Sequence, residues 1–212
     1  ISLVHSQTNV QFAIYTDFGI GAWEDGINAF EEFLDWKCIT HERVTPFIIN
    51  DTELKNYYDA IYFPGGDSDY YNAAIDENGI NHIRNLVREG GAYIGICAGA
   101  AFACDTLVWE GVKYNRNLDL FDGNAIAPMD NIAPYPEYDM TEISMDQDNP
   151  INEFETNTET MLYYGGPTFT AKSTMILDTV GTYDEHFNYP AIVNFYYGEG
   201  RVLLIGPHPE IE

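Results

Sequence analysis

Residues 91–101 read Gly91-Ala92-Tyr93-Ile94-Gly95-Ile96-Cys97-Ala98-Gly99-Ala100-Ala101, an apolar run that leads into a cysteine flanked by glycines. The run has the pattern of a buried strand, and its end has the G-x-nucleophile-x-G form of a strand-to-helix elbow. In such an elbow the nucleophile occupies a strained turn around which only very small neighbours fit. The pattern predicts that Cys97 projects its sulfur at the start of the next helix, where exposed amides favour a thiolate. The alternative interpretation is a small-residue turn that holds a buried, inert cysteine.

A second apolar strand pattern, Gly200-Arg201-Val202-Leu203-Leu204-Ile205, is followed by Gly206-Pro207-His208-Pro209-Glu210. Pro209 fixes its own φ and favours an extended conformation at His208. In an extended segment residues two apart project to the same side, so Glu210 can orient the imidazole of His208. A nucleophilic cysteine needs such a base, and the base needs an orienting group. The alternative is a loop histidine capped by a neighbouring acid.

The third element is a short hydrophobic strand, Ala60 to Phe63, followed by Pro64-Gly65-Gly66-Asp67. Adjacent glycines allow the backbone to approach a ligand closely, so Gly65 and Asp67 are candidate substrate-binding residues. Acyl transfer needs two N–H donors aimed at the developing oxyanion. The amide of Ala98, directly after the cysteine, is one candidate, and the amide of Gly66 is the other. An ordinary turn after a strand is the alternative.

In their order along the chain, Phe63-Pro64-Gly65-Gly66, Gly95-Ile96-Cys97-Ala98-Gly99 and His208-Pro209-Glu210 resemble the three signature blocks of class I glutamine amidotransferases. More narrowly, the chain is similar to the amidotransferase-like N-terminal domain of long-form biotin protein ligases and its stand-alone relatives. The resemblance implies a flavodoxin-like three-layer α/β fold and a Cys-His-Glu triad on Cys97, His208 and Glu210. It implies no defined substrate.

One position departs from the amidotransferase pattern. Glutamine-using members place Gln two residues after the second elbow glycine, where this chain has Ala101, whose side chain cannot hydrogen-bond. Glutamine is therefore a doubtful substrate. Tyr163, Tyr164 and Gly165 are expected to line the cleft and to favour another acyl group. The alternative for the two tyrosines is packing on the core at a strand end.

Strand and helix patterns alternate along the rest of the chain. We expect a mainly parallel central sheet with helices on both faces, whose active site lies beyond the carboxyl ends of the strands. Expected strands cover 10–15, 44–49, 60–63, 92–96, 161–164, 175–183, 191–196 and 201–205, and expected helices cover 23–36 and a segment that ends at Gly90-Gly91. Residues 106–158 are expected to form an irregular insertion or a β-rich flap within a single domain, 1–212.

The chain has 212 residues, 45% of them hydrophobic, and a formal net charge of −25. Such a negative field repels nucleic acid and anionic membrane surfaces, so neither is expected as a partner. No apolar run approaches the ~20 residues that a membrane helix needs. We expect a soluble protein, cytoplasmic or exported after loss of an N-terminal segment, since the sequence begins at Ile1 rather than Met.

The cysteines and histidines show no spacing typical of a metal site, and no complete nucleotide-binding motif is present, so neither a metal nor a cofactor is expected. Cys38 and Cys104 could pair only in an oxidising compartment, and Cys104 is interpreted as a small core residue.

The sequence therefore predicts a cysteine-dependent acyl-transfer or amide-hydrolysing enzyme that acts on a small-molecule or peptide amide, in which water, or an amine bound by a synthase partner, resolves the thioester. Two alternatives remain open. One is a non-catalytic binding or regulatory module on the same fold. The other is a cysteine protein similar to the ThiJ/PfpI families, which would use Asp17 or Glu24 rather than His208.

Overall fold

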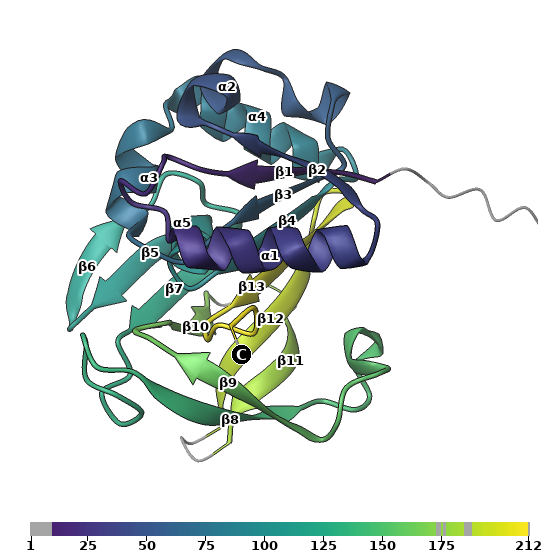
Figure 1. Ribbon diagram of the computed structural model, residues 1–212. Coiled ribbons are helices and arrows are strands. Elements are labelled where there is room, and N and C mark those ends of the chain that lie inside the picture. Colours follow the sequence, from purple (N-terminus) through teal and green to yellow (C-terminus); the bar gives the residue numbers. More distant parts are fainter. Residues whose placement is uncertain (1–9, 173–174, 176, 185–187, 212) are drawn as a thin grey trace, which may run out of the picture.

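The computed structural model describes residues 10–172, 175, 177–184 and 188–211. Within these residues the main sheet has nine strands, and its first five strands run parallel (Figure 1). Its strands, in spatial order, are β2 (Thr40–Val44), β1 (Gln11–Tyr15), β3 (Ala60–Phe63), β4 (Ala92–Ile96), β13 (Gly200–Ile205), β12 (Tyr189–Tyr197), β11 (Asp178–Tyr183), β8 (Asp139–Met145) and β9 (Thr158–Tyr163).

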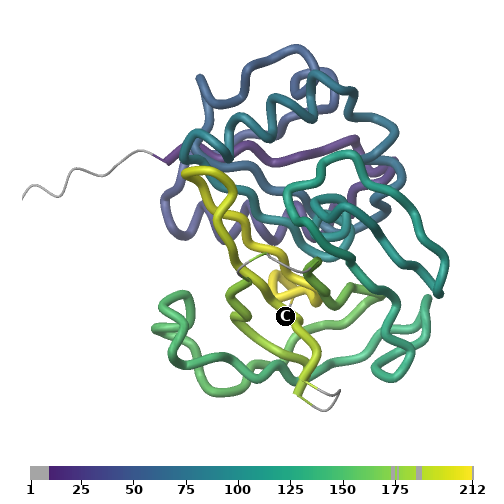
Figure 2. The backbone as a smooth tube through the Cα atoms, turned by 180° about the vertical axis from the view of Figure 1, so that it is seen from behind, coloured from purple at the N-terminus to yellow at the C-terminus, as the bar shows by residue number. Residues whose placement is uncertain are grey.

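The expectation of a mainly parallel sheet holds only for the half from β2 to β13. The strands β13, β12, β11, β8 and β9 pair antiparallel, so the whole sheet is mixed. A tight turn at Gly198, with φ +62°, joins β12 to β13, and antiparallel neighbours need no more than such a hairpin. Seen from behind, the C-terminal hairpin runs between the N-terminal half of the molecule and the green strands (Figure 2).

Helices cover both faces of the parallel half. On one face Phe30 of α1 (Glu24–Trp36) stacks on Tyr62 with ring centroids 3.9 Å apart. On the other face Phe63 packs against Tyr71 of α3 (Ser68–Ala74) and Phe102 of α5 (Ala98–Ala103). Since Tyr62 and Phe63 are neighbours in one strand, their side chains point to opposite faces. The remaining helices are α2 (Pro46–Asp51), α4 (Glu77–Arg88), and the short 3₁₀ turns Leu54–Asn56 and Pro150–Asn152.

The expected strand at 44–49 is wrong. Val44 ends β2, and α2 begins two residues later. The side chain of Thr45 accepts a hydrogen bond from the amide of Ile48, and Pro46 occupies the first helical turn. A Thr N-cap followed by Pro at N1 is a helix start signal, which outweighs the apolar residues that follow it.

The segment 106–158, expected to be irregular or β-rich, contains strands. Most belong to a second sheet of four strands, which lies beside the parallel half. Its order is β10 (Thr168–Ala171), β7 (Phe121–Ala127), β5 (Cys104–Trp109) and β6 (Val112–Asn115). The expected strands of the last fifty residues match β9, β11, β12 and β13, although residues 173, 174 and 176 lie outside the described part. In that part, no helix is long and apolar enough to cross a membrane.

Candidate functional site

Three neighbouring parallel strands end at the same edge of the sheet, and each is followed by one of the predicted blocks. In the register of β3, β4 and β13, Phe63 lies opposite Gly95, and Ile96 lies opposite Ile205. The amide of Cys97 donates to the carbonyl oxygen of Ile205 over 2.8 Å. Strand pairing thus brings together the Gly65-Gly66 turn, the cysteine elbow and the segment of His208, which are far apart in the sequence.

The elbow backbone is strained at the cysteine itself. Cys97 has φ +50° and ψ −105°, a conformation that residues other than glycine seldom adopt. A Cβ on Gly99 would lie 2.1 Å from the carbonyl oxygen of Phe63, and one on Gly95 would lie 2.6 Å from the carbonyl oxygen of Gly99. Gly99 is therefore needed for the turn to pack against β3, and Gly95 for the start of α5 to pack on β4. Cys97 is 8% exposed, and its sulfur contacts the carbonyl oxygen of Tyr164 at 3.7 Å.

The imidazole of His208 is held on several sides. Its Nδ1 lies 2.8 Å from Oε1 of Glu210, and both side chains are almost fully buried. Trp23 packs edge-on against the ring, with centroids 4.9 Å apart, and a Cβ on Gly65 would come within 2.5 Å of its Cε1. The amide of His208 donates to the carbonyl oxygen of Leu162 in β9. These contacts fix the ring orientation, so that Glu210 accepts from Nδ1 and Nε2 is left for other chemistry.

Nε2 of His208 is buried and makes no hydrogen bond of normal geometry with another described residue. Burial by itself lowers the pKa of His208. Electrostatic interaction with Cys97, followed by the hydrogen bond and charge of Glu210, outweighs that effect and raises the pKa of His208 from 6.5 to about 10. An imidazolium at this position would stabilise a thiolate on a neighbouring cysteine, which is the reactive form of a cysteine–histidine pair.

The two candidate oxyanion donors, Gly66 and Ala98, line the same cavity as Cys97. The amides of Gly66 and Ala98 have no backbone acceptor among the described residues. Gly66 is held in place because the flanking amides of Trp23 and Asp67 bond to Gly65 and Gly21. Its φ of +133° and a Cβ position 2.0 Å from the oxygen of Gly21 admit only glycine.

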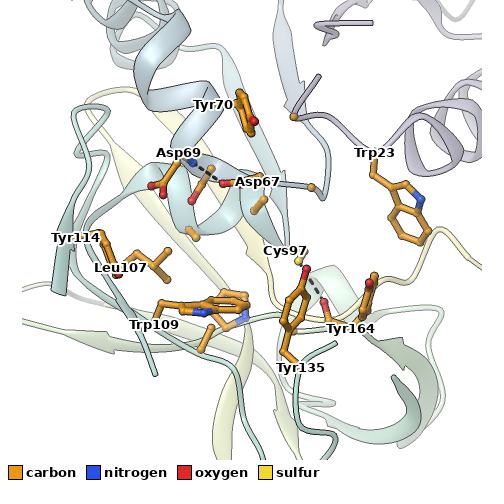
Figure 3. Close-up of a pocket in the computed structure, with 18 of the residues that line it drawn as sticks. Trp23, Asp67, Asp69, Tyr70, Cys97, Leu107, Trp109, Tyr114, Tyr135 and Tyr164 are labelled. Atoms are coloured by element: carbon orange, nitrogen blue, oxygen red, sulfur yellow. Dashed lines mark hydrogen bonds between the residues drawn. The ribbon is translucent and has the colours of Figure 1, made fainter. Parts of the chain in front are cut away.

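A cavity of about 590 Å³ opens over this edge of the sheet (Figure 3). Cys97, His208, Gly66 and Ala98 all line it. The other lining residues are Ile20, Gly21, Trp23, Asp67, Ser68, Asp69, Tyr70, Ala101, Leu107, Trp109, Tyr114, Arg116, Ala127, Tyr135, Tyr164, Gly165 and Pro167. A volume of several hundred Å³ is typical of small-molecule sites.

The predicted substrate-binding residues divide into two groups. Asp67, Tyr164 and Gly165 line the cavity. Tyr163 does not: it is fully buried, and its hydroxyl accepts a hydrogen bond from the amide of Met129. The reason is strand geometry, because neighbouring residues point to opposite sides. Gly65 contributes contact with the His208 ring rather than a cavity wall.

Several lining residues had no signal in the sequence. Trp109 comes from the end of β5, Tyr135 from the loop before β8, and Arg116 from the residue after β6. The guanidinium of Arg116 is buried and lies 2.7 Å from Oδ1 of Asp69. A lone aromatic or arginine in a region without periodicity cannot be assigned to a site before its strand partners are known.

The two acids of the ThiJ/PfpI alternative are engaged elsewhere. Asp17 accepts hydrogen bonds from the amides of Ile20, Gly21 and Ala22, which shapes the β1–α1 loop. Glu24 lies 2.9 Å from Arg43. Within the described residues there is no cluster of three or more His, Cys, Asp or Glu side chains that could hold a metal ion.

Solved structures define the class of fold. A glutamine amidotransferase crystal structure matches with a TM-score of 0.68 and 18% identity, covering 94% of this chain and 90% of that one. A β-galactosidase from Bacillus circulans sp. alkalophilus matches with a TM-score of 0.63 and 11% identity, covering 95% of this chain and 29% of that one. At such identities the likeness concerns the fold alone, which is amidotransferase-like.

The particular family follows from the sequence comparison. The family model described as "Biotin-protein ligase, N terminal" matches residues 31–212, and the chain belongs to this family. The biotin–protein ligase of Schizosaccharomyces pombe is 27% identical over 165 residues, which cover 71% of this chain and 25% of that protein. An uncharacterized protein of Chlamydia muridarum is 37% identical over 87 residues, covering 39% of this chain and 34% of that protein. The chain thus corresponds to a minor part of the length of both relatives.

Proposed function

We propose that this chain is a cysteine-dependent acyl-transfer or amide-hydrolysing domain in which Cys97 is the nucleophile, His208 the base and Glu210 the orienting acid. The observation that carries the proposal is the environment of His208. Its Nδ1 is bonded to Glu210, its Nε2 is free of other bonds in the described structure, and its pKa responds to the Cys97 sulfur in the same cavity. A resting ion pair of this kind activates a thiol without a metal or cofactor.

In the proposed reaction the Cys97 thiolate attacks the carbonyl carbon of an amide and forms a tetrahedral oxyanion. The amides of Gly66 and Ala98 would donate hydrogen bonds to that oxygen. The C–N bond then breaks, and His208 gives its Nε2 proton to the leaving amine. Water, deprotonated by the same nitrogen, attacks the thioester, so that the C–S bond breaks and the acid and the thiol are released. An amine bound by a partner protein would take the place of water in a transfer reaction.

Glutamine is not the substrate that this cavity favours. Ala101 lines the cavity but offers no side-chain hydrogen bond to a glutamine substrate, and much of the wall is aromatic. The ligase activity in the name of the yeast relative is not included in the proposal, because the chain corresponds to a quarter of that protein.

The test is the alkylation rate of Cys97 by iodoacetamide at pH 6, in a Cys38→Ser background that removes the exposed cysteine. We expect Cys97 to react much faster than a free peptide thiol, and His208→Ala to lower the rate about 100-fold, as expected for loss of a positioned base. His82→Ala is the matched control, since that histidine bonds to Ile49 outside the cavity.

Two results would contradict the proposal. A rate equal to that of a free thiol would favour the non-catalytic module. A fast rate that survives His208→Ala but falls with Asp17→Asn or Glu24→Gln would favour the ThiJ/PfpI-like alternative.

A further inference from the structure

We propose that the cavity selects substrates whose acyl group carries a positive charge, such as a protonated amine or a quaternary ammonium, close to the scissile carbonyl. This inference rests on the proposed function and adds the substrate class to it. It follows from three properties of the cavity: its aromatic walls, its carboxylates, and the engagement of its arginine.

Four aromatic side chains of the wall contact one another in series beside Cys97. The rings of Trp109 and Tyr135 meet edge to face at 5.1 Å, and Tyr135 stacks on Tyr164 at 5.7 Å. Trp23 closes the set on the far side of Tyr164 at 6.5 Å. Faces of tryptophan and tyrosine attract organic cations, and surrounding a quaternary ammonium with several such rings is a known means of binding it. An apolar acyl chain would also fit these walls, so the rings alone do not decide the charge.

The carboxylates of the cavity favour a positively charged acyl group over a neutral one. In Figure 3, Asp67 and Asp69 lie across the cavity from Leu107 and Trp109, so that a group extending from Cys97 passes between acids and rings. The carboxylate of Asp67 accepts a hydrogen bond from the amide of Asp69 as the N-cap of α3, and Asp67 has no basic partner within salt-bridge distance in the described structure. The negative charge of Asp67 also acts on Tyr135. Burial, its neighbour Tyr164, and then Asp67 and Cys97 raise the pKa of its hydroxyl.

The single arginine of the lining does not reverse this preference. Nε and Nη2 of Arg116 donate to Ser68, Nη2 also pairs with Asp69, and Nη1 donates to the carbonyl oxygen of Asn115. A substrate carboxylate would have to displace these buried bonds, which leaves acceptors unpaired. The described lining therefore has two carboxylates, Asp67 and Asp69, and one guanidinium, Arg116, which is already engaged. Cys97 and His208 are counted as a neutral pair.

The overall charge of −25 acts in the same direction but over a longer range. Its effect on a cationic reagent is screened beyond about 8 Å at physiological ionic strength. Selection by the cavity is local and survives added salt, whereas attraction by the whole surface does not. This difference separates the two causes in the experiment.

The probes are two methanethiosulfonates of similar size, one with a trimethylammonium group and one with a sulfonate. Each transfers its thioalkyl group to the Cys97 thiolate, so that a mixed disulfide forms and methanesulfinate leaves. Rates are measured in the Cys38→Ser background and divided by the rates with a free peptide thiol. We expect the normalised cation-to-anion ratio to exceed 10 and to stay above about 5 in 0.5 M salt.

Asp67→Asn is the decisive variant, because asparagine can still cap α3 while the charge is lost. We expect it to lower the ratio 3- to 10-fold. Asp148→Asn changes the net charge equally at an exposed site and is expected to leave the ratio unchanged. A cation-to-anion ratio near 1 would overturn the inference. A ratio that falls to about 1 in 0.5 M salt and is unchanged by Asp67→Asn would also overturn it.

These results are separable from the test of the proposed function. If Cys97 reacts rapidly with neutral iodoacetamide in a His208-dependent manner but shows no charge preference, only the substrate class is wrong. If Cys97 reacts as a free thiol, the enzymatic proposal fails, and with it the inference that a cationic acyl group is processed here.

Discussion

The two halves of the molecule contribute to the site in different ways. The parallel half, β2-β1-β3-β4-β13, presents backbone: the Cys97 elbow, the Gly66 amide and the segment that carries His208. The antiparallel half and the second sheet present side chains, chiefly Trp109, Tyr135 and Tyr164. In the first half, Cβ atoms added at Gly66 and Gly99 would lie 2.0 and 2.1 Å from carbonyl oxygens. In the second, rings meet at ordinary contact distances. We infer that the reactivity of Cys97 depends on main-chain geometry in the parallel half, whereas selectivity depends on side chains from both halves, Asp67 among them.

The largest effect should come from breaking the His208–Glu210 pair on the parallel side. We expect Glu210→Gln to lower the alkylation rate of Cys97 at pH 7 about 30- to 100-fold, because the imidazolium loses its charged partner. Glu155→Gln, an exposed change, is the matched control. An unchanged rate in Glu210→Gln would show that Glu210 does not orient His208, and circular dichroism would check that both variants are folded.

The second prediction compares one glycine from each half. Gly99→Ala places a Cβ 2.1 Å from a carbonyl oxygen of β3, so we expect a loss of about 3 kcal/mol or more in the free energy of unfolding. A Cβ at Gly165 would lie 3.1 Å from the ring of Tyr135 and 3.4 Å from that of Trp109, and the φ of Gly165 is +67°, so Gly165→Ala should lose about 1–2 kcal/mol. Urea unfolding measures both. Equal losses would show that the backbone contact at Gly99 is no more restrictive than the side-chain contacts at Gly165.

The third prediction concerns pH. The pKa of His208 is raised from 6.5 to about 10, so the stabilisation from its protonated form is fully present below pH 6.5 and is lost as pH rises through about 10. We expect the His208 Cε1 proton to titrate near pH 10 in NMR spectra. In Cys97→Ala it should titrate at a clearly lower pH, because the largest raising influence is gone. His41 lies outside the site, so its signals should be the same in both proteins. A His208 pKa near 6.5 in the unmodified chain would show that no thiolate lies beside it.

The blocks that sequence alone predicted are those under backbone constraint. Gly95, Gly99 and Gly66 fill places with no room for a Cβ, and the proline after His208 fixes an extended segment. Such constraints act between near neighbours, so they leave fixed spacings in the sequence. Pairing of β4 with β13 then brings the blocks together, as the carboxyl-end rule for parallel strands predicts.

The cavity walls could not be predicted in the same way. Trp109, Arg116 and Tyr135 reach the cavity only through the pairing of strands in the second sheet and a loop between sheets. Pairing of this kind depends on long-range packing, which no local pattern records. Tyr163, the last residue of β9, and Tyr164, the residue after it, show the same limit, because choosing between them requires knowing which side is buried. By contrast, Thr45 followed by Pro46 is a helix start signal that the sequence itself contains.

The smallest expected effect is at the walls themselves and tests whether the rings act as a cation site. Choline and 3,3-dimethylbutanol have the same shape but differ in charge. Comparing how well each protects Cys97 from iodoacetamide therefore isolates the contribution of the positive charge to binding. We expect choline to protect at about 5-fold lower concentration, in line with a contribution of about 1 kcal/mol from ring faces. Tyr135→Leu removes a ring that contacts two others while keeping an apolar wall. This variant should reduce the choline advantage about 2- to 3-fold, whereas Tyr189→Leu, on a strand outside the cavity lining, should not. If Tyr135→Leu weakened protection by both molecules equally, the ring would act through shape alone, and selectivity for charge would have to come from Asp67.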